Sequence, residues 1–173
     1  MNFNIKTIPE VLQEINDGDT LVLLTECKDN AALKNILGHA FIPKGKFLLP
    51  SGTPPYTEDS APKNMNPSNL WVESKSLSRF IRQDLKPSVR ENLFIQMLEK
   101  VHPTESKLLL LIKDQNLESE YPNITLDKVV DSGFFIWPHG IDREDYVQKR
   151  QPVIELESKV KVKKPRSPKN NKI

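Results

Sequence analysis

The stretch PSVRENLFIQMLEKVHPTESKLLLLIKD, residues 87–114, decides the fold of this chain. Ser88 and Glu91 are spaced as a capping box, and the apolar residues that follow recur on one broad helical stripe. Pro103 then interrupts the helix, since proline cannot continue it. Residues 105–113 are apolar around nearly the whole circumference, so we expect a second helix there that is the most buried element. The short connection predicts an antiparallel helix pair.

Towards the N-terminus, capping patterns predict two further helices. Thr7 and Glu10 form a capping box in front of another apolar stripe, and Asp29 or Asn30 begins a later helix. Residues 20–27 between them fit either a short buried strand or a helix. We favour a helix, because no neighbouring segment offers a convincing partner strand.

Two more helices are expected on either side of the central pair. One runs from about residue 70 to residue 84, and a last short helix begins at Thr125 and ends at Gly133. Together these elements predict an all-α fold of about five to six short helices. The helical domain spans residues 1–140, and a long proline-rich loop interrupts it.

That loop, residues 50–69, contains five prolines, which exclude a regular element. Pro54, Pro55 and Tyr56 are candidate partner-binding residues, because an exposed proline segment with an aromatic side chain suits the groove of a partner. The alternative is a covering loop in which Leu48 and Tyr56 close the core. We favour this second interpretation, although long loops of this kind are often functional or disordered.

The apolar segment FFIWP, residues 134–138, is the second candidate contact surface. It follows the last predicted helix and is expected to dock onto the body of the domain or onto a partner. Phe135 and Trp137 are its candidate partner-binding residues, because buried aromatic anchors dominate many interfaces.

Charge is divided unevenly along the chain. The net charge is +2, but the last fifteen residues carry seven Lys or Arg and no acid, which leaves about −5 on the rest. We expect residues 141–173 to form a flexible charged tail. The tail could bind nucleic-acid phosphates or an acidic protein surface, or serve only as a solubilising appendage. The candidate contact residues are Lys159, Lys161, Lys163, Lys164, Arg166, Lys169 and Lys172, with Arg79 and Arg82 assisting.

No pattern in the sequence is typical of a catalytic or cofactor site. His39, His102 and His139 each stand alone, without a second ligand at helical spacing, so we expect no metal site. The two glycine motifs that bind nucleotide phosphates, GxxxxGK(S/T) and GxGxxG, are both absent from the sequence. The longest apolar run is far shorter than the ~20 residues of a membrane-spanning helix. We therefore expect a non-enzymatic protein that uses no cofactor and does not enter a membrane.

Two motifs resemble those of a protein family. LLPSGTPPY at 48–56, followed by RENLFIQMLEKVHPTESKLLLLIKD at 90–114, is similar to a family of small proteins from T-even-like tailed phages, well represented in marine phages. In that family a helix of the type IPEVLxEI precedes the loop, and a short closing helix follows the helical pair. The likeness covers residues 7–136. This chain differs in a longer insertion around 57–69 and in the tail after about residue 140.

The resemblance implies a phage accessory protein in the cytoplasm of the infected host cell. It links the chain to the phage protein that binds the core of the host RNA polymerase. The implied partner is therefore a protein of the host or phage transcription or replication machinery. The alternative function is nucleic-acid binding through the basic tail, and the oligomeric state is left open.

Overall fold

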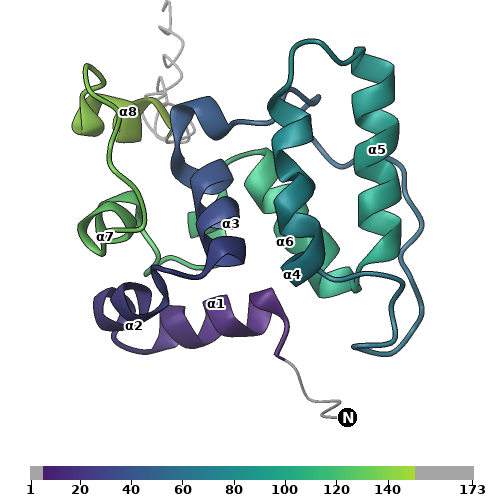
Figure 1. The fold of residues 1–173 in the computed structure, drawn as a ribbon, viewed down its shortest axis with the longest axis horizontal. Helices are drawn as coiled ribbons and strands as arrows, with labels where there is room; N and C mark the ends of the chain where they lie inside the picture. Colours follow the sequence, from purple (N-terminus) through teal and green to yellow (C-terminus); the bar gives the residue numbers. More distant parts are fainter. Residues whose placement is uncertain (1–5, 151–173) are drawn as a thin grey trace, which may run out of the picture. The chain divides into compact units, whose positions relative to one another are not determined.

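The structure of this protein, a computed structural model, describes residues 6–150, and its described residues form helices and connections without a strand. The chain divides into two units, residues 1–139 and 140–173. The all-α prediction is confirmed. In chain order the first unit contains α1 Ile8–Asp17, α2 Thr20–Cys27, α3 Ala31–Phe41, η1 Pro43–Gly45, α4 Leu70–Glu73, η2 Ser74–Ile81, α5 Pro87–Lys100, α6 Pro103–Lys113, η3 Leu117–Ser119 and α7 Leu126–Asp131. Figure 1 labels the α-helices among them.

The first helices begin where local capping places them. The backbone N–H of Thr7 donates to Glu10 Oε2 at 2.8 Å, which completes the predicted capping box of α1. Residues 20–27 form helix α2, as favoured, and Asp19 caps it. Of the two residues proposed to begin α3, Asn30 is the cap, because its side chain accepts from the N–H groups of the first turn.

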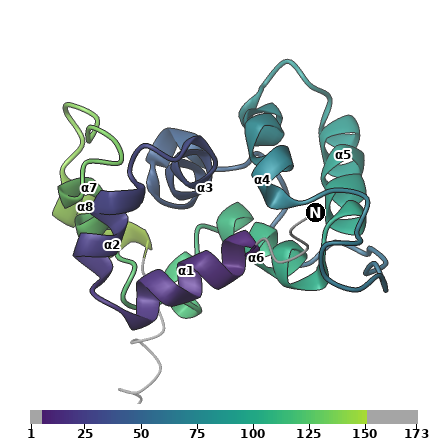
Figure 2. The same ribbon diagram turned by 60° about the horizontal axis from the view of Figure 1, so that its bottom comes forward.

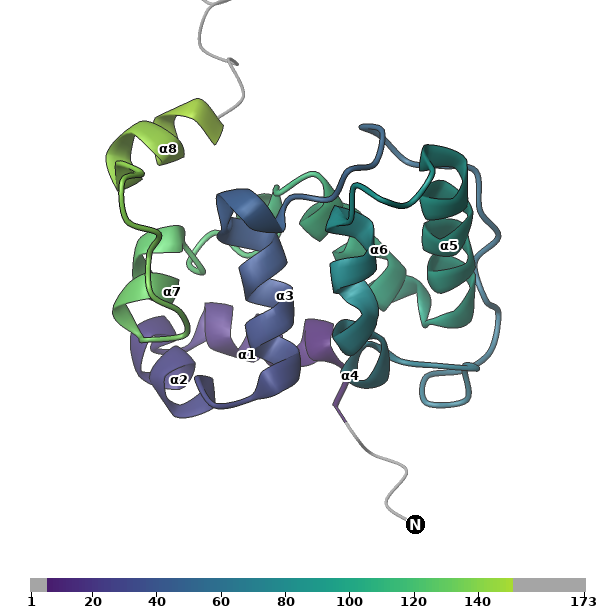
Figure 3. The same cartoon turned by 45° about the horizontal axis from the view of Figure 1, so that its top comes forward.

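The central helix pair is present, but its first cap differs from the prediction. Helix α5 begins at Pro87, so Ser88 lies inside the first turn and cannot act as the cap. The capping box predicted from Ser88 and Glu91 is therefore wrong. Helix α6 is capped by His102, whose Nδ1 accepts from the N–H of Thr104. The two helices pack against each other (Figure 3).

The helix predicted over residues 70–84 is shorter and changes its type. Four residues of α-helix, α4, continue into eight residues of 3₁₀-helix, η2, which ends at Ile81. The buried residues of η2 are Ser74, Leu77 and Phe80, and their spacing of three matches the three residues per turn of a 3₁₀-helix. The continuous 3₁₀ geometry therefore points all three side chains into the core.

Aromatic rings join α3, η2 and α5 at the centre of the core. Phe47 contacts Phe80 at a centroid distance of 5.2 Å and Phe94 at 6.1 Å, and Phe80 meets Phe94 edge to face at 5.3 Å. His39 of α3 lies 5.2 Å from Phe47. Helix α3 also contacts α6, and α1 lies across α6 (Figure 2).

A long connection, residues 46–69, follows the outer side of α5 from one end to the other, and we name it the proline strap (Figure 1). The N–H of Thr57 donates to Glu99 Oε1 at 3.2 Å, and the N–H of Ser68 donates to Lys100 O at 3.0 Å. The strap covers α5, but Leu48 is 43% exposed and does not close the core. The buried aromatic residue at this point is Phe47, the neighbour of Leu48.

Gly45 provides a first prediction, because it sits where no side chain fits. An added Cβ would lie 2.6 Å from Gly38 O and 3.0 Å from the Cα of His39. The carbonyl of Gly45 also accepts a hydrogen bond from His39 Nδ1 at 2.9 Å. Gly45→Ala is expected to lower the free energy of unfolding by about 2 kcal/mol, through overpacking. Urea denaturation followed by circular dichroism measures the loss.

Gly38→Ala is the matched control for this prediction. A Cβ at Gly38 meets only Ile42 Cδ1, at 3.9 Å, and the residue lies inside α3. Alanine is favoured over glycine in a helix interior by up to about 1 kcal/mol, so this variant should be as stable as the wild type or more stable. Equal unfolding midpoints for the two variants would show that the close approach at Gly45 is unimportant.

The end of the first unit combines a buried and an exposed aromatic segment. Thr125 caps α7 as predicted, and Gly133 follows it with a φ of +82°. Phe134 is fully buried, whereas Ile136, two residues later, is 88% exposed. The segment therefore anchors to the core through its first phenylalanine.

The second unit contains one described helix, α8, Arg143–Arg150. We expected no regular structure after residue 140, so this expectation is wrong for these eight residues. The cause is local, because Asp142 Oδ1 accepts from the N–H of Asp145 at 2.9 Å, as a helix cap does. No helix within residues 6–150 has the length and apolar character needed to cross a bilayer.

Candidate functional site

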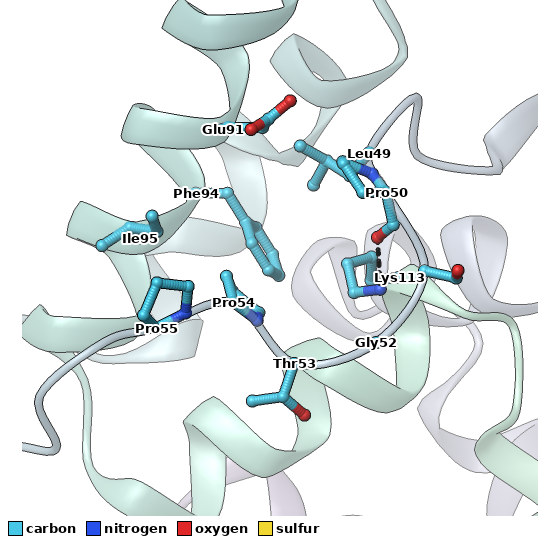
Figure 4. Close-up of a pocket in the computed structure, with 11 residues that line it drawn as sticks. Leu49, Pro50, Gly52, Thr53, Pro54, Pro55, Glu91, Phe94, Ile95 and Lys113 are labelled. Carbon is cyan, nitrogen blue, oxygen red and sulfur yellow. Dashed lines mark hydrogen bonds between the residues drawn. The ribbon is translucent and has the colours of Figure 1, made fainter.

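A pocket of about 370 Å³ opens between the proline strap and helices α5 and α6 (Figure 4). The strap forms one side as an arch from Leu49 to Pro55. Helix α5 forms the other side, and the last residue of α6 also lines the pocket. The lining residues are Leu49, Pro50, Ser51, Gly52, Thr53, Pro54, Pro55, Glu91, Phe94, Ile95 and Lys113.

Lys113 holds the strap in place from below. Its side chain is only 2% exposed, and its Nζ donates to Pro50 O at 2.9 Å and to a carboxylate oxygen of Asp114 (Figure 4). A buried ammonium needs such partners, because an unpaired buried charge is strongly unfavourable. Lys113 therefore holds the start of the arch by the backbone carbonyl of Pro50, and this contact does not use a side chain of the strap.

Arg90, which precedes Phe94 by one turn of α5, also holds the strap in place. Its guanidinium is buried and donates to Leu48 O at 2.5 Å, to Arg82 O at 2.7 Å and to Leu85 O at 2.9 Å. The planar fork of five donors suits several carbonyls at once. Two buried cations thus tie residues 48 and 50 of the strap to α5 and α6.

Apolar side chains form most of the remaining wall. The Phe94 ring points towards the arch, Ile95 flanks it, and Pro54 and Pro55 face them from the strap (Figure 4). Phe94 is held by its contacts with Phe80 and Phe47 in the core. The wall is therefore rigid, as expected of a preformed binding pocket.

The charges around the pocket are not balanced. Lys113 and Glu91 are its two charged lining residues, and Asp114 pairs with Lys113. Within residues 6–150, none of the ion pairs or hydrogen bonds involves the Glu91 carboxylate. Glu91 is half-buried at the rim, so it leaves one negative charge available to a ligand.

A second pocket, of about 270 Å³, lies between α1 and α6. It differs from the strap pocket in the pairing of its charged residues. Its charged side chains are paired with each other. Lys63 Nζ lies 2.5 Å from Glu10 Oε1, and Lys107 Nζ lies 2.8 Å from Glu120 Oε1. The Lys63 contact and a hydrogen bond from Thr7 lower the pKa of Glu10. We therefore regard the strap pocket as the candidate binding site.

Outside both pockets, Glu105 of α6 is a buried carboxyl group that joins three helix N-termini. It is 1% exposed, and the N–H of Leu70, the first residue of α4, donates to its Oε1 at 3.2 Å. Burial raises the pKa of Glu105 to about 7, while hydrogen bonds from the backbone of Leu70, His102 and Ile8 act in the opposite direction. These three residues stand at the starts of α4, α6 and α1.

The structure brings together only some of the site residues proposed from the sequence. Pro54 and Pro55 line the pocket, whereas Tyr56 does not and instead donates from Oη to Glu58 at 3.4 Å. Burial raises the pKa of the Tyr56 phenol, and the Glu58 charge adds to this effect. Phe135 and Trp137 are half-buried and take no part in the strap pocket.

The remaining proposed contacts lie elsewhere. Arg82 pairs with Asp84 on the surface, and Arg79 Nε donates to Ser76 O at 3.0 Å. The seven basic residues from Lys159 to Lys172 lie outside the described residues. Within residues 6–150, no three His, Cys, Asp or Glu side chains gather as a metal site would require.

Sequence reasoning missed Arg90, Glu91 and Lys113 as site residues, although a pattern pointed to two of them. Arg90 lies four residues before Phe94 on the buried stripe of α5, and Lys113 lies four residues after Leu109 on that of α6. A charged residue in phase with an apolar stripe is buried with it and must find partners. No comparable pattern marks Glu91 in the sequence, because glutamates are common on the exposed faces of helices.

The fold and the site define a small all-helical protein that carries a preformed pocket beside a fixed proline strap. The DUF6433 family, a family of unknown function, matches residues 11–119, and the chain belongs to this family. The matched region includes the whole strap, both helices of the pair and every residue that lines the pocket. No curated protein and no solved structure matches the chain.

Proposed function

We propose that this protein is a binding module that recognises another protein through the strap pocket. The observation that carries the proposal is the fixed strap, which Arg90 and Lys113 hold by its backbone carbonyls. An ordered loop loses little conformational entropy when a ligand binds, and this lowers the cost of association. The pocket is also large enough and apolar enough to accept a side chain of a partner.

The proposed partner belongs to the host or phage transcription or replication machinery, and the core of the host RNA polymerase is the first to test. This part of the proposal rests on the resemblance carried by residues 48–56 and 90–114. Those residues supply the whole strap arch, α5 from Arg90 onward and all of α6. The protein would then act as a non-enzymatic phage accessory protein in the cytoplasm of the infected cell.

Ile95→Trp tests the proposal directly, because it places an indole against the pocket. We expect the wild type to bind purified RNA polymerase core in biolayer interferometry and Ile95→Trp to weaken binding at least tenfold. Gln96→Trp is the matched control, since Gln96 is the next residue on α5, is exposed and does not line the pocket. We expect Gln96→Trp to bind within about twofold of the wild type.

The outcomes test the role of the pocket and the identity of the partner separately. Equal loss in both tryptophan variants would contradict a role for the pocket. Failure of the wild type to bind would reject the core polymerase as the partner. Circular dichroism spectra of both variants confirm that each remains folded.

The uneven charge of the chain favours a second candidate function, which is binding to nucleic acid. The seven basic residues among positions 159–173 would contact phosphates without sequence preference. Such binding would weaken steeply as salt is raised, whereas binding of an apolar side chain in the strap pocket would not.

A further inference from the structure

We infer that the strap pocket selects an extended peptide in which a bulky apolar residue and a Lys or Arg stand two positions apart. This inference rests on the proposed binding function and names the chemistry of the ligand. Three features of the described residues support it: the apolar wall, the unpaired charge of Glu91, and the spacing between them along α5.

The apolar wall sets the first requirement. Phe94, Ile95, Pro54 and Pro55 are among the residues that line the pocket, whose volume of about 370 Å³ exceeds the size of one large side chain. An apolar residue that enters this pocket removes its own surface and that of the wall from water. A Leu, Phe, Met or Trp side chain of the peptide would therefore supply the anchor.

The unpaired charge sets the second requirement. Lys113 already has Asp114 and the carbonyl of Pro50 as partners, so the positive charge beneath the pocket is satisfied. The Glu91 carboxylate at the rim has no such partner within residues 6–150. Charge complementarity therefore favours a basic side chain on the ligand and disfavours an acidic one.

The spacing on α5 sets the register. Glu91 precedes Ile95 by four residues, so the two side chains lie on one face of the helix, about 6 Å apart along its axis. Two residues of an extended peptide span about 6.6 Å, and their side chains point to the same side. An apolar residue over Ile95 thus places the side chain two positions away over Glu91.

Glu99 continues the same face one turn further along α5. Its Oε1 accepts from the N–H of Thr57 on the strap, so it is already engaged. Selection should therefore depend on Glu91 much more than on Glu99. The expected motif is one basic residue two positions from the apolar anchor, on the side that faces Glu91.

The experiment is a selection of random twelve-residue peptides displayed on phage, against immobilised full-length protein. The wild type should enrich peptides with an apolar residue and a Lys or Arg two positions apart at least fivefold over the unselected library. Glu91→Lys should lose this preference. A synthetic peptide from the enriched set should bind Glu91→Lys at least tenfold more weakly than the wild type in fluorescence anisotropy. Glu91→Gln should lie between the two.

Ile95→Trp and Gln96→Trp serve as the blocked and control proteins in the same selection. Enrichment that Ile95→Trp abolishes, but that shows no basic residue at this spacing, would overturn the inference and leave the binding function standing. A peptide set that Ile95→Trp enriches as well as the wild type does would overturn both. Equal affinity of the synthetic peptide for the wild type and Glu91→Lys would also overturn the inference.

Discussion

Replacing Arg90 by methionine is expected to lower the free energy of unfolding by about 3 kcal/mol. The guanidinium bonds to the carbonyls of Leu48, Arg82 and Leu85, and methionine leaves all three without this donor. Each hydrogen bond that this buried, charged donor makes contributes about 1 kcal/mol or more, so the loss of three accounts for the expected change. The same change releases residue 48 of the strap, so ligand binding at the pocket should weaken as well.

Arg82→Met is the control for this prediction, because it removes the same charge from an exposed site. Arg82 pairs with Asp84, and both side chains are more than half exposed, with 58% and 61% of their surfaces accessible. Exposed ion pairs contribute little, so Arg82→Met should unfold at nearly the same urea concentration as the wild type. Urea denaturation at pH 7 measures both variants. A loss for Arg90→Met no larger than that for Arg82→Met would show that the three carbonyl bonds do not stabilise the fold.

Glu105→Gln is expected to change how stability depends on pH. The pKa of Glu105 is about 7 in the folded protein, against an ordinary value of 4.5, so the folded state holds its proton more tightly than the unfolded chain. The stabilisation by this proton is complete below about pH 4.5 and is lost as pH rises to about 7. Glutamine stays neutral throughout and can accept the hydrogen bond from Leu70.

The two proteins should therefore differ most at high pH. Between pH 5 and pH 8, the stability of Glu105→Gln should rise relative to that of the wild type by roughly 3 kcal/mol. Urea denaturation of both proteins at several pH values measures this difference. The two proteins share all other titrating groups, so the contributions of those groups cancel in the comparison. The control is Glu26→Gln, which changes an exposed carboxyl group on α2. If the free energies of unfolding of the wild type and Glu105→Gln changed with pH in parallel, the raised pKa of Glu105 would be refuted.

Both predictions concern buried side chains that hold separate parts of the fold together. Arg90 and Lys113 hold the strap, while Glu105 joins the starts of α1, α4 and α6. All three titratable side chains are buried, and backbone groups supply most of their partners. The site is thus built on a fixed scaffold, which is what a pocket that selects a short peptide requires.

Local patterns in the sequence predicted most of the helices. Thr7, Asn30 and Thr125 act as caps, and Gly133 follows α7 with the positive φ expected of such a residue. These features succeed because a cap bonds to backbone groups only two or three residues away. The Ser88 cap failed because Pro87 is itself the first helical residue. Pro54 and Pro55 line the strap pocket, and their role in partner binding stays a prediction.

The sequence by itself determined where the chain is helical, how the apolar stripes face inward and where the charge is concentrated. Only the tertiary structure decided that Arg90 and Lys113 hold the strap, and that Glu91 has no partner among residues 6–150 and lies beside an apolar pocket. The physical reason is that the partners of the two cations are largely backbone carbonyls, up to 63 residues away along the chain. Every residue carries a carbonyl group, so the sequence holds no mark of which ones a buried charge will find.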